Sequence, residues 1–250
     1  MKLLKILALV ITLSACALSQ IGLFRQTNME ILKSAIDKYD ADGGMYLIVD
    51  AKTKEPLEKG SIKFDRTIPF YSHNLVKLYM LTAGLNSGVY TKKDIYFNDH
   101  GKEFSKKLKP KDKTRIFAEL GLQINPKNTY IAEKLLLAYL NVFNNEENLL
   151  TANQLNMLKK AVRNNVVNGP AKNANIAEAE VSGLTSTTTK EENHNEVITQ
   201  FTGTFSANDH IYGIITVLDN PKGIKETYGF KSAGWNAVPL ARDIIKNIKK

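Results

Sequence analysis

The chain has 250 residues, of which 43% are hydrophobic and 24% are charged. These values are ordinary for a folded domain and exclude a largely disordered chain. The length allows one large hydrophobic core or at most two modest ones. The formal net charge of +9 favours a polyanionic surface as a partner through long-range attraction.

The first residues have the pattern of an export signal. Lys2 and Lys5 precede an apolar run at residues 6–13, and Ser14-Ala15-Cys16 follows. This order gives a basic segment, a short apolar segment and small residues at a cleavage site. We therefore predict a signal peptide over residues 1–16 and an exported chain in a bacterial cell envelope.

Cys16 is the only cysteine, which excludes an internal disulfide. The run at residues 13–16 resembles the lipobox of bacterial lipoproteins. That resemblance implies lipidation of Cys16 and an N-terminal anchor on a membrane facing the periplasm or the outside. Two alternatives stay open: a plain export signal in which Cys16 has no role, and an uncleaved signal anchor in which residues 17–24 extend the apolar run.

The next elements alternate between helix and strand. Residues 29–39 carry apolar side chains at helical spacing, which predicts a helix. The apolar run at 45–49 predicts a buried strand. Polar residues at 50–55 predict a turn that leads into Pro56-Leu57, so the two runs are expected to form a hairpin.

Residues 75–85 are almost wholly apolar, which predicts a core helix that ends near Gly84 or Gly88. Asn74 stands just before this run and is predicted to be its N-cap, because an amide oxygen can accept from the first free backbone N–H groups.

The stretch at residues 101–115 is basic and contains a proline, and we predict that it is a loop. Phe104 is its only aromatic residue, so it has no aromatic ladder on which bases could stack. For an exported chain we expect no nucleic-acid partner. The basic residues of this stretch are Lys102, Lys106, Lys107, Lys109, Lys111, Lys113 and Arg115.

The second half of the chain changes from helices to strands. Apolar spacing predicts helices at 128–143 and 153–166. Residues 181–188, 197–206 and 210–218 predict strands, and Ala207-Asn208-Asp209 predicts a hairpin turn between the last two. A final amphipathic helix is predicted at 237–248.

Strands from both ends of the chain are therefore expected in one antiparallel sheet with helices on its faces, an α+β fold. Neither a repeat nor a low-complexity linker divides the sequence. We predict a single domain over residues 25–250.

Four local patterns follow the order and spacing of a known family. They are the hairpin at 45–57, the turn at 74–77, Val181-Ser182-Gly183-Leu184-Thr185-Ser186-Thr187, and the hairpin at 201–223. On these patterns residues 33–248 resemble the transpeptidase domain of class B penicillin-binding proteins, the peptidoglycan D,D-transpeptidase family. The resemblance implies the penicillin-binding and β-lactamase-like fold.

In that family a serine attacks the substrate carbonyl, and a lysine three residues later accepts its proton. Lys77 stands at the lysine position, but Asn74 stands at the serine position. An amide cannot supply the attacking oxygen, so the resemblance implies a lost nucleophile. The family's Ser-x-Asn motif is expected between Lys77 and Gly121, and the sequence contains none there.

The family's Lys-Thr-Gly motif is also altered. Leu184 replaces the lysine that pairs with the substrate carboxylate, and Ser186 replaces the glycine, while Thr185 and Thr187 remain. Leucine offers no charge, and a serine side chain adds bulk where the substrate backbone lies against the strand.

These departures predict a catalytically impaired domain that binds a peptidoglycan stem peptide or cell-wall synthesis proteins. One alternative is an active minimal D,D-transpeptidase or carboxypeptidase that uses Ser72 with Lys77, although a five-residue offset separates two side chains by about 140° around a helix. Another alternative is a purely structural adaptor on the same fold.

The residues for metal or cofactor chemistry are missing from the sequence. The histidines form no i, i+4 pair and have no partnering cysteine, so we predict no metal site. No glycine-rich phosphate loop or dinucleotide fingerprint occurs, so we predict no cofactor. The histidines are His73, His100, His194 and His210.

Overall fold

The structure is a computed structural model, and it describes residues 26–95, 108–125, 127–190, 193, 195–222 and 232–249. The predicted signal peptide with Cys16 lies outside these residues, as do residues 101–107 of the basic stretch, His100 and His194. The helices are α2 (Asn28–Tyr39), α3 (His73–Asn86), α4 (Pro110–Glu119), α5 (Ala132–Asn144), α6 (Ala152–Val167) and α7 (Ala237–Ile248).

The strands form one large sheet and one small one. In the large sheet the order is β2-β1-β7-β6-β5, and every neighbouring pair is antiparallel. The small sheet pairs β3 with β4. The strands are β1 (Gly43–Asp50), β2 (Pro56–Ile62), β3 (Phe70–Tyr71), β4 (Thr129–Tyr130), β5 (Ser182–Thr189), β6 (Val197–Ala207) and β7 (His210–Asp219).

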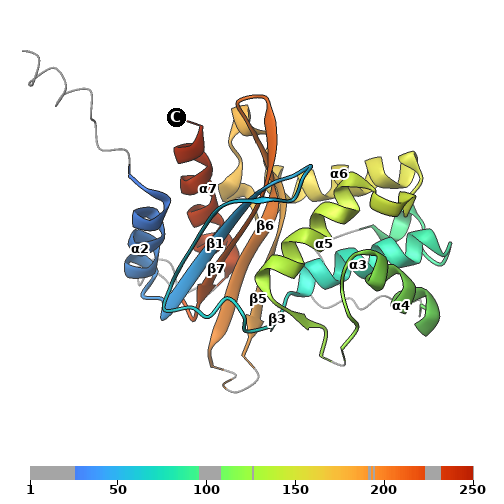
Figure 1. Ribbon diagram of the computed structural model, residues 1–250, viewed down its shortest axis with the longest axis horizontal. Helices are drawn as coiled ribbons and strands as arrows, with labels where there is room; N and C mark the ends of the chain where they lie inside the picture. Colours follow the sequence, from blue (N-terminus) through green and yellow to red (C-terminus); the bar gives the residue numbers. More distant parts are fainter. Residues whose placement is uncertain are drawn as a thin grey trace, which may run out of the picture.

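The large sheet lies between two layers of helices. Figure 1 shows α2 and α7 on one side of it and the group α3, α4, α5 and α6 on the other. The first strand therefore joins strands from the end of the chain, as the sequence predicted, and the α+β fold class is confirmed.

Burial on both faces explains the continuous apolar run of β1. Met45, Leu47 and Val49 belong to the core shared with α3 and α5. Tyr46 and Ile48 belong to the core shared with α2 and α7. Because successive side chains of a strand point to opposite faces, a central strand covered on both sides needs apolar residues at every position.

The terminal hairpin follows its predicted turn. Asn208 and Asp209 have φ values of 51° and 62°, which is the left-handed conformation that a two-residue hairpin turn of this kind requires and that Asn and Asp tolerate. The predicted helices at 29–39, 153–166 and 237–248 are also confirmed, within one residue at each end.

The prediction of a loop throughout residues 101–115 was wrong at its C-terminal end, because α4 begins at Pro110. The backbone N–H of the first helical residue has no hydrogen-bond partner within the helix. Because proline lacks only this N–H, it starts the helix at this position and does not break it. Ile116 and Phe117 are the buried residues of α4; Phe117 packs edge-on against Tyr79 of α3, with ring centroids 6.1 Å apart.

The helix predicted at 128–143 begins later than expected. Asn128 has φ 51°, and Thr129–Tyr130 pair with Phe70–Tyr71 as a short sheet before α5 starts at Ala132. This small sheet holds the segment that leads into α3. Within the described residues, no helix is long and apolar enough to cross a membrane.

Candidate functional site

The altered motifs meet where the N-terminus of α3 faces the edge strand β5. β5 is the last strand of the large sheet, so one of its sides lacks a neighbouring strand. α3 is buried around most of its circumference, which fixes the position of its first turn. The structure thus brings together Ser72, Asn74 and the strand residues 184–187.

Asn74 is bound to the strand by its side chain. Its Nδ2 donates a hydrogen bond to the carbonyl oxygen of Thr185 at 2.7 Å. The prediction that Asn74 is the N-cap was wrong: Asn74 is the second residue of α3, and Ser72 occupies the N-cap position without a capping bond from its side chain. The strand carbonyl, rather than the helix end, determines where this amide points.

The residues before Asn74 continue along the strand. The backbone N–H of His73 donates to Ser186 Oγ at 2.9 Å, and Thr188 Oγ1 donates to the carbonyl oxygen of Tyr71 at 2.9 Å. Ser186, which stands at the family's glycine position, is therefore bound to the first turn of α3. The segment 71–74 lies against residues 185–188 of β5.

Side chains of α6 contact the other half of the same edge. Asn165 Nδ2 donates to the carbonyl oxygen of Gly183 at 2.8 Å, and the guanidinium of Arg163 donates to the carbonyl oxygen of Val181. Every second carbonyl from 181 to 185 thus accepts from a side chain. Since alternate residues present their backbone groups on the same side of a strand, these donors occupy the row that an added peptide strand would use.

The lysine position of the Lys-Thr-Gly motif lies in the protein interior. Leu184 is 1% exposed and belongs to the core between the sheet and α3. Thr185 and Ser186 are buried as well, whereas Thr187 is exposed and its Oγ1 accepts from the backbone N–H of Ala233 at 2.9 Å. No cation therefore stands at position 184 to attract a substrate carboxylate.

Ser72, the alternative nucleophile, has no access to solvent. It is 0% exposed, and its Oγ has no hydrogen-bond partner among the described residues. The hydrogen bond to Lys77 that would activate this hydroxyl is therefore not formed. Lys77 is itself buried, with 6% exposure.

The aromatic neighbours of this site are also fixed. The rings of Tyr71 and His73 pack edge to face, with centroids 6.1 Å apart. Burial raises the pKa of Tyr71 above its ordinary value.

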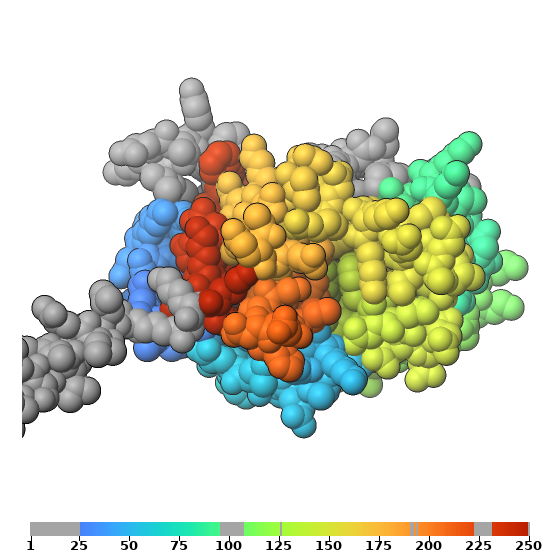
Figure 2. Space-filling model, turned by 90° about the horizontal axis from the view of Figure 1, so that it is seen from above, coloured from blue at the N-terminus to red at the C-terminus, as the bar shows by residue number. Residues whose placement is uncertain are grey.

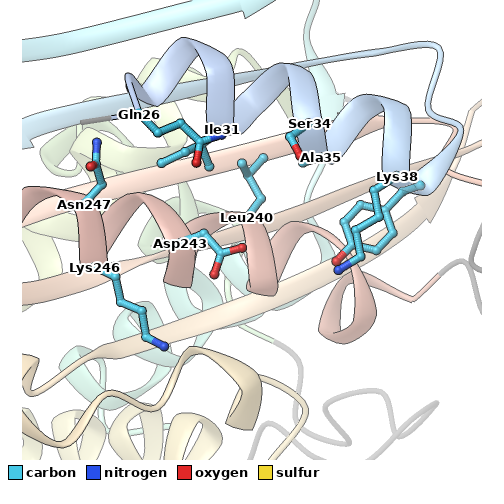
Figure 3. A pocket seen from close by; sticks show the side chains of 10 residues that line it. Gln26, Ile31, Ser34, Ala35, Lys38, Leu240, Asp243, Lys246 and Asn247 are labelled. Carbon is cyan, nitrogen blue, oxygen red and sulfur yellow. The ribbon is translucent and has the colours of Figure 1, made fainter. Parts of the chain in front are cut away.

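A separate groove of about 290 Å³ lies between α2 and α7, on the opposite side of the sheet. Figure 3 shows Ile31 and Leu240 within it and the charged groups of Lys38, Asp243 and Lys246 along it. The described residues that line this groove include none of the candidate site residues predicted from the sequence. The part of the chain that the structure describes has no group of three or more His, Cys, Asp or Glu side chains placed to hold a metal ion.

Sequence comparison gives one partial match. No protein-family model matches the chain. The probable peptidoglycan D,D-transpeptidase FtsI of Caulobacter vibrioides is 31% identical over 102 residues, which are 36% of this chain and 17% of that protein. The match thus spans about a sixth of the length of that curated relative.

Structure comparison covers nearly all of the chain. The transpeptidase domain of the FtsI4 D,D-transpeptidase from Legionella pneumophila matches 90% of this chain and 96% of that domain, with a TM-score of 0.65 and 18% identity. The transpeptidase domain of penicillin-binding protein 3 from Burkholderia pseudomallei matches 88% and 91%, with a TM-score of 0.71 and 15% identity. The chain has the fold of a penicillin-binding-protein transpeptidase domain.

The predicted resemblance to this transpeptidase domain is confirmed. The sequence predicted that Asn74, Leu184 and Ser186 depart from the penicillin-binding pattern, and the structure places them at the contact between α3 and β5. The sequence did not locate Arg163 and Asn165, whose donors lie on the edge of β5. A guanidinium and an amide more than three turns into a polar helix give no local signal of that role.

Proposed function

We propose that this chain is a catalytically impaired penicillin-binding-like domain of the cell envelope. It is anchored at a membrane by its N-terminus and binds cell-wall synthesis proteins or a peptidoglycan stem peptide without forming an acyl-enzyme. The observation that carries the proposal is the bond from Asn74 Nδ2 to the carbonyl oxygen of Thr185. A carboxamide held on the strand at the nucleophile position cannot attack a carbonyl.

Two further features support lost catalysis. Leu184 lies in the core instead of offering a cation, and Ser186 is hydrogen-bonded to the first turn of α3. Catalytic groups of one site act as a unit, so losing the nucleophile alone removes several orders of magnitude in rate. Ser72 does not compensate, because a hydroxyl with 0% exposure cannot reach a substrate.

Between the two classes of ligand, the site favours a protein partner. A stem peptide ends in a carboxylate, but position 184 has no charge to attract it. Such a peptide would also pair with the open edge of β5, but the carbonyls of 181, 183 and 185 on that edge already accept from side chains. A folded protein partner requires neither a cation at position 184 nor free backbone carbonyls on β5. The envelope location rests on the signal pattern with Cys16 and on the similarity to envelope transpeptidases.

Intact-mass analysis after incubation with a fluorescent penicillin tests the impairment. We expect no covalent adduct on this chain, under conditions in which an active class B transpeptidase domain is labelled. A stoichiometric adduct would overturn the proposal. If labelling occurred and disappeared in Ser72→Ala, the active enzyme that uses Ser72 would replace it.

Calorimetric titration with a stem pentapeptide tests the ligand class. Measurable binding would favour the stem peptide, whereas no measurable binding favours a protein partner. For the anchor, radiolabelled fatty acid should be incorporated by the intact chain in cells and not by Cys16→Ala.

A further inference from the structure

A second surface of the molecule, at the end of the β5 edge that is farther from the α3 contact, has a concentrated positive charge. An open groove of about 610 Å³ runs between α6 and the segment that leads into β5. Figure 2 shows α6, in yellow, on the face of the molecule that is seen from above. The groove is lined by Lys159, Lys160, Arg163, Val167, Glu180 and Ser182, among others.

The three cations stand within about one turn of the helix. Lys159 lies four residues and Lys160 three residues before Arg163, and such positions are neighbours on a helix surface. Like charges at this spacing destabilise a helix by a few tenths of a kcal/mol per pair. None of the three forms an ion pair with a described residue, and Glu180 is the one carboxylate in the groove lining.

Arg163 is fixed in place rather than mobile in solvent. Its guanidinium donates to the carbonyl oxygen of Val181 and, at 3.4 Å, to Asn175 Oδ1. A guanidinium already held in position loses less conformational entropy when it binds an anion. The two lysines have exposed side chains and can reach an anion in the groove as point charges.

We propose that this groove binds a linear polymer that carries phosphate groups but no bases. The groove has more positive than negative side chains, and the whole chain also has a formal net charge of +9. Both favour an anionic ligand. The groove volume of about 610 Å³ suits several groups of a chain rather than one enclosed ion.

The lining of the groove argues against other anionic partners. None of the described residues that line it is aromatic, so they offer no stacking platform for nucleic-acid bases. Among the described lining residues, only Val167 and Ala177 are apolar, which leaves little to hold the side chains of an acidic peptide. A flat membrane surface would meet the rim of the groove but not its interior.

Binding of fluorescent inorganic polyphosphate to the purified full-length protein tests the proposal. The affinity should fall linearly with salt on a logarithmic scale, with a slope of about −2 to −3, as expected for three phosphate contacts. In Lys159→Gln with Lys160→Gln the affinity at low salt should fall by about tenfold or more, and the slope should decrease by about 2. Arg163 is not changed, because its guanidinium also donates a hydrogen bond to the carbonyl oxygen of Val181.

The control is Lys33→Gln with Lys38→Gln on α2, which removes the same charge from a different face and should change the affinity less than about twofold. An equal loss in both variants would show that only net charge matters and would overturn the assignment. Equal binding of polyglutamate, or tighter binding of a single-stranded oligonucleotide of equal charge, would also overturn the assignment. Binding of anionic vesicles without binding of polyphosphate would overturn it as well. The outcome of this polyphosphate experiment does not depend on whether a ligand binds where α3 meets β5.

Discussion

The side chain of Asn74 and the backbone of Thr185 are joined by a 2.7 Å hydrogen bond between residues 111 positions apart. This bond links the first turn of the central helix to the edge strand of the sheet. It gives Asn74, which the sequence resemblance aligns with the nucleophile, a structural role as a hydrogen-bond donor. The residue to which the proposed function assigns the loss of catalysis therefore also joins the first turn of α3 to β5.

Replacement of Asn74 by alanine should lower the free energy of unfolding by about 1 to 2 kcal/mol, because the buried carbonyl of Thr185 loses its side-chain donor. Urea denaturation followed by circular dichroism measures this change. The control is Asn156→Ala on the exposed side of α6, which should stay within about 0.5 kcal/mol of the parent. Equal stability of Asn74→Ala and the parent would show that the bond does not matter.

Ser186 provides a second, independent link, which Ser186→Ala tests. Loss of the acceptor for the His73 N–H should cost about 1 kcal/mol and should raise the hydrogen-exchange rate of the first amides of α3 relative to the middle of that helix. Ser186→Thr keeps a hydroxyl and should preserve the protection. If both variants exchanged like the parent, the bond from His73 would contribute nothing to the order of the helix start.

The sequence predicted those parts of the fold that local chemistry determines. Asn208-Asp209 specify a tight turn because both residues tolerate positive φ, and the run at 45–49 specifies a strand because it is apolar at every position. Both appear as predicted. The start of α4 was missed because Pro110 was interpreted as a breaker, although proline is favoured at the first position of a helix.

The candidate site could be predicted only in part, for a physical reason. Residue identity at single positions, Asn74 and Leu184, predicted the loss of the nucleophile and of the motif lysine. The new partners of the strand edge could not be found, since Asn165 and Gly183 meet only through the packing of α6 against β5. The role of Asn74 was misassigned for the same reason: an N-cap is a local pattern, whereas a bond to Thr185 requires the tertiary structure.

Restoring the hydroxyl alone should not restore catalysis. Asn74→Ser puts a serine three residues before Lys77, but position 184 still has no cation and Ser186 still lies in the strand. We expect no penicillin adduct by intact-mass analysis within the time that labels an active class B domain completely. Rapid labelling of Asn74→Ser would show that one substitution accounts for the whole loss, and that Leu184 and Ser186 do not block acylation.

The acid sensitivity of the fold should depend on Asp42, which lies where β1 meets the end of β7. Lys222 Nζ donates to Asp42 Oδ1 and Asn220 Nδ2 donates to Asp42 Oδ2, both at 2.7 Å. The hydrogen bond from Lys222, followed by that from Asn220, lowers the pKa of Asp42 below its ordinary value. A carboxylate with a lowered folded-state pKa stabilises the fold above its unfolded pKa of about 3.9, and this stabilisation is lost as the pH falls through the folded-state pKa.

Asp42→Asn should therefore reduce the dependence of stability on pH below about pH 4. At pH 7 it should cost less than about 1 kcal/mol, because both partners of this ion pair are nearly half exposed and solvent screens them. Thermal unfolding from pH 2.5 to 7 measures both effects, with Asp37→Asn as a variant of equal charge change on α2. If Asp42→Asn and the parent lost stability in parallel as the pH fell, the contacts with Lys222 and Asn220 would not be the source of the acid sensitivity.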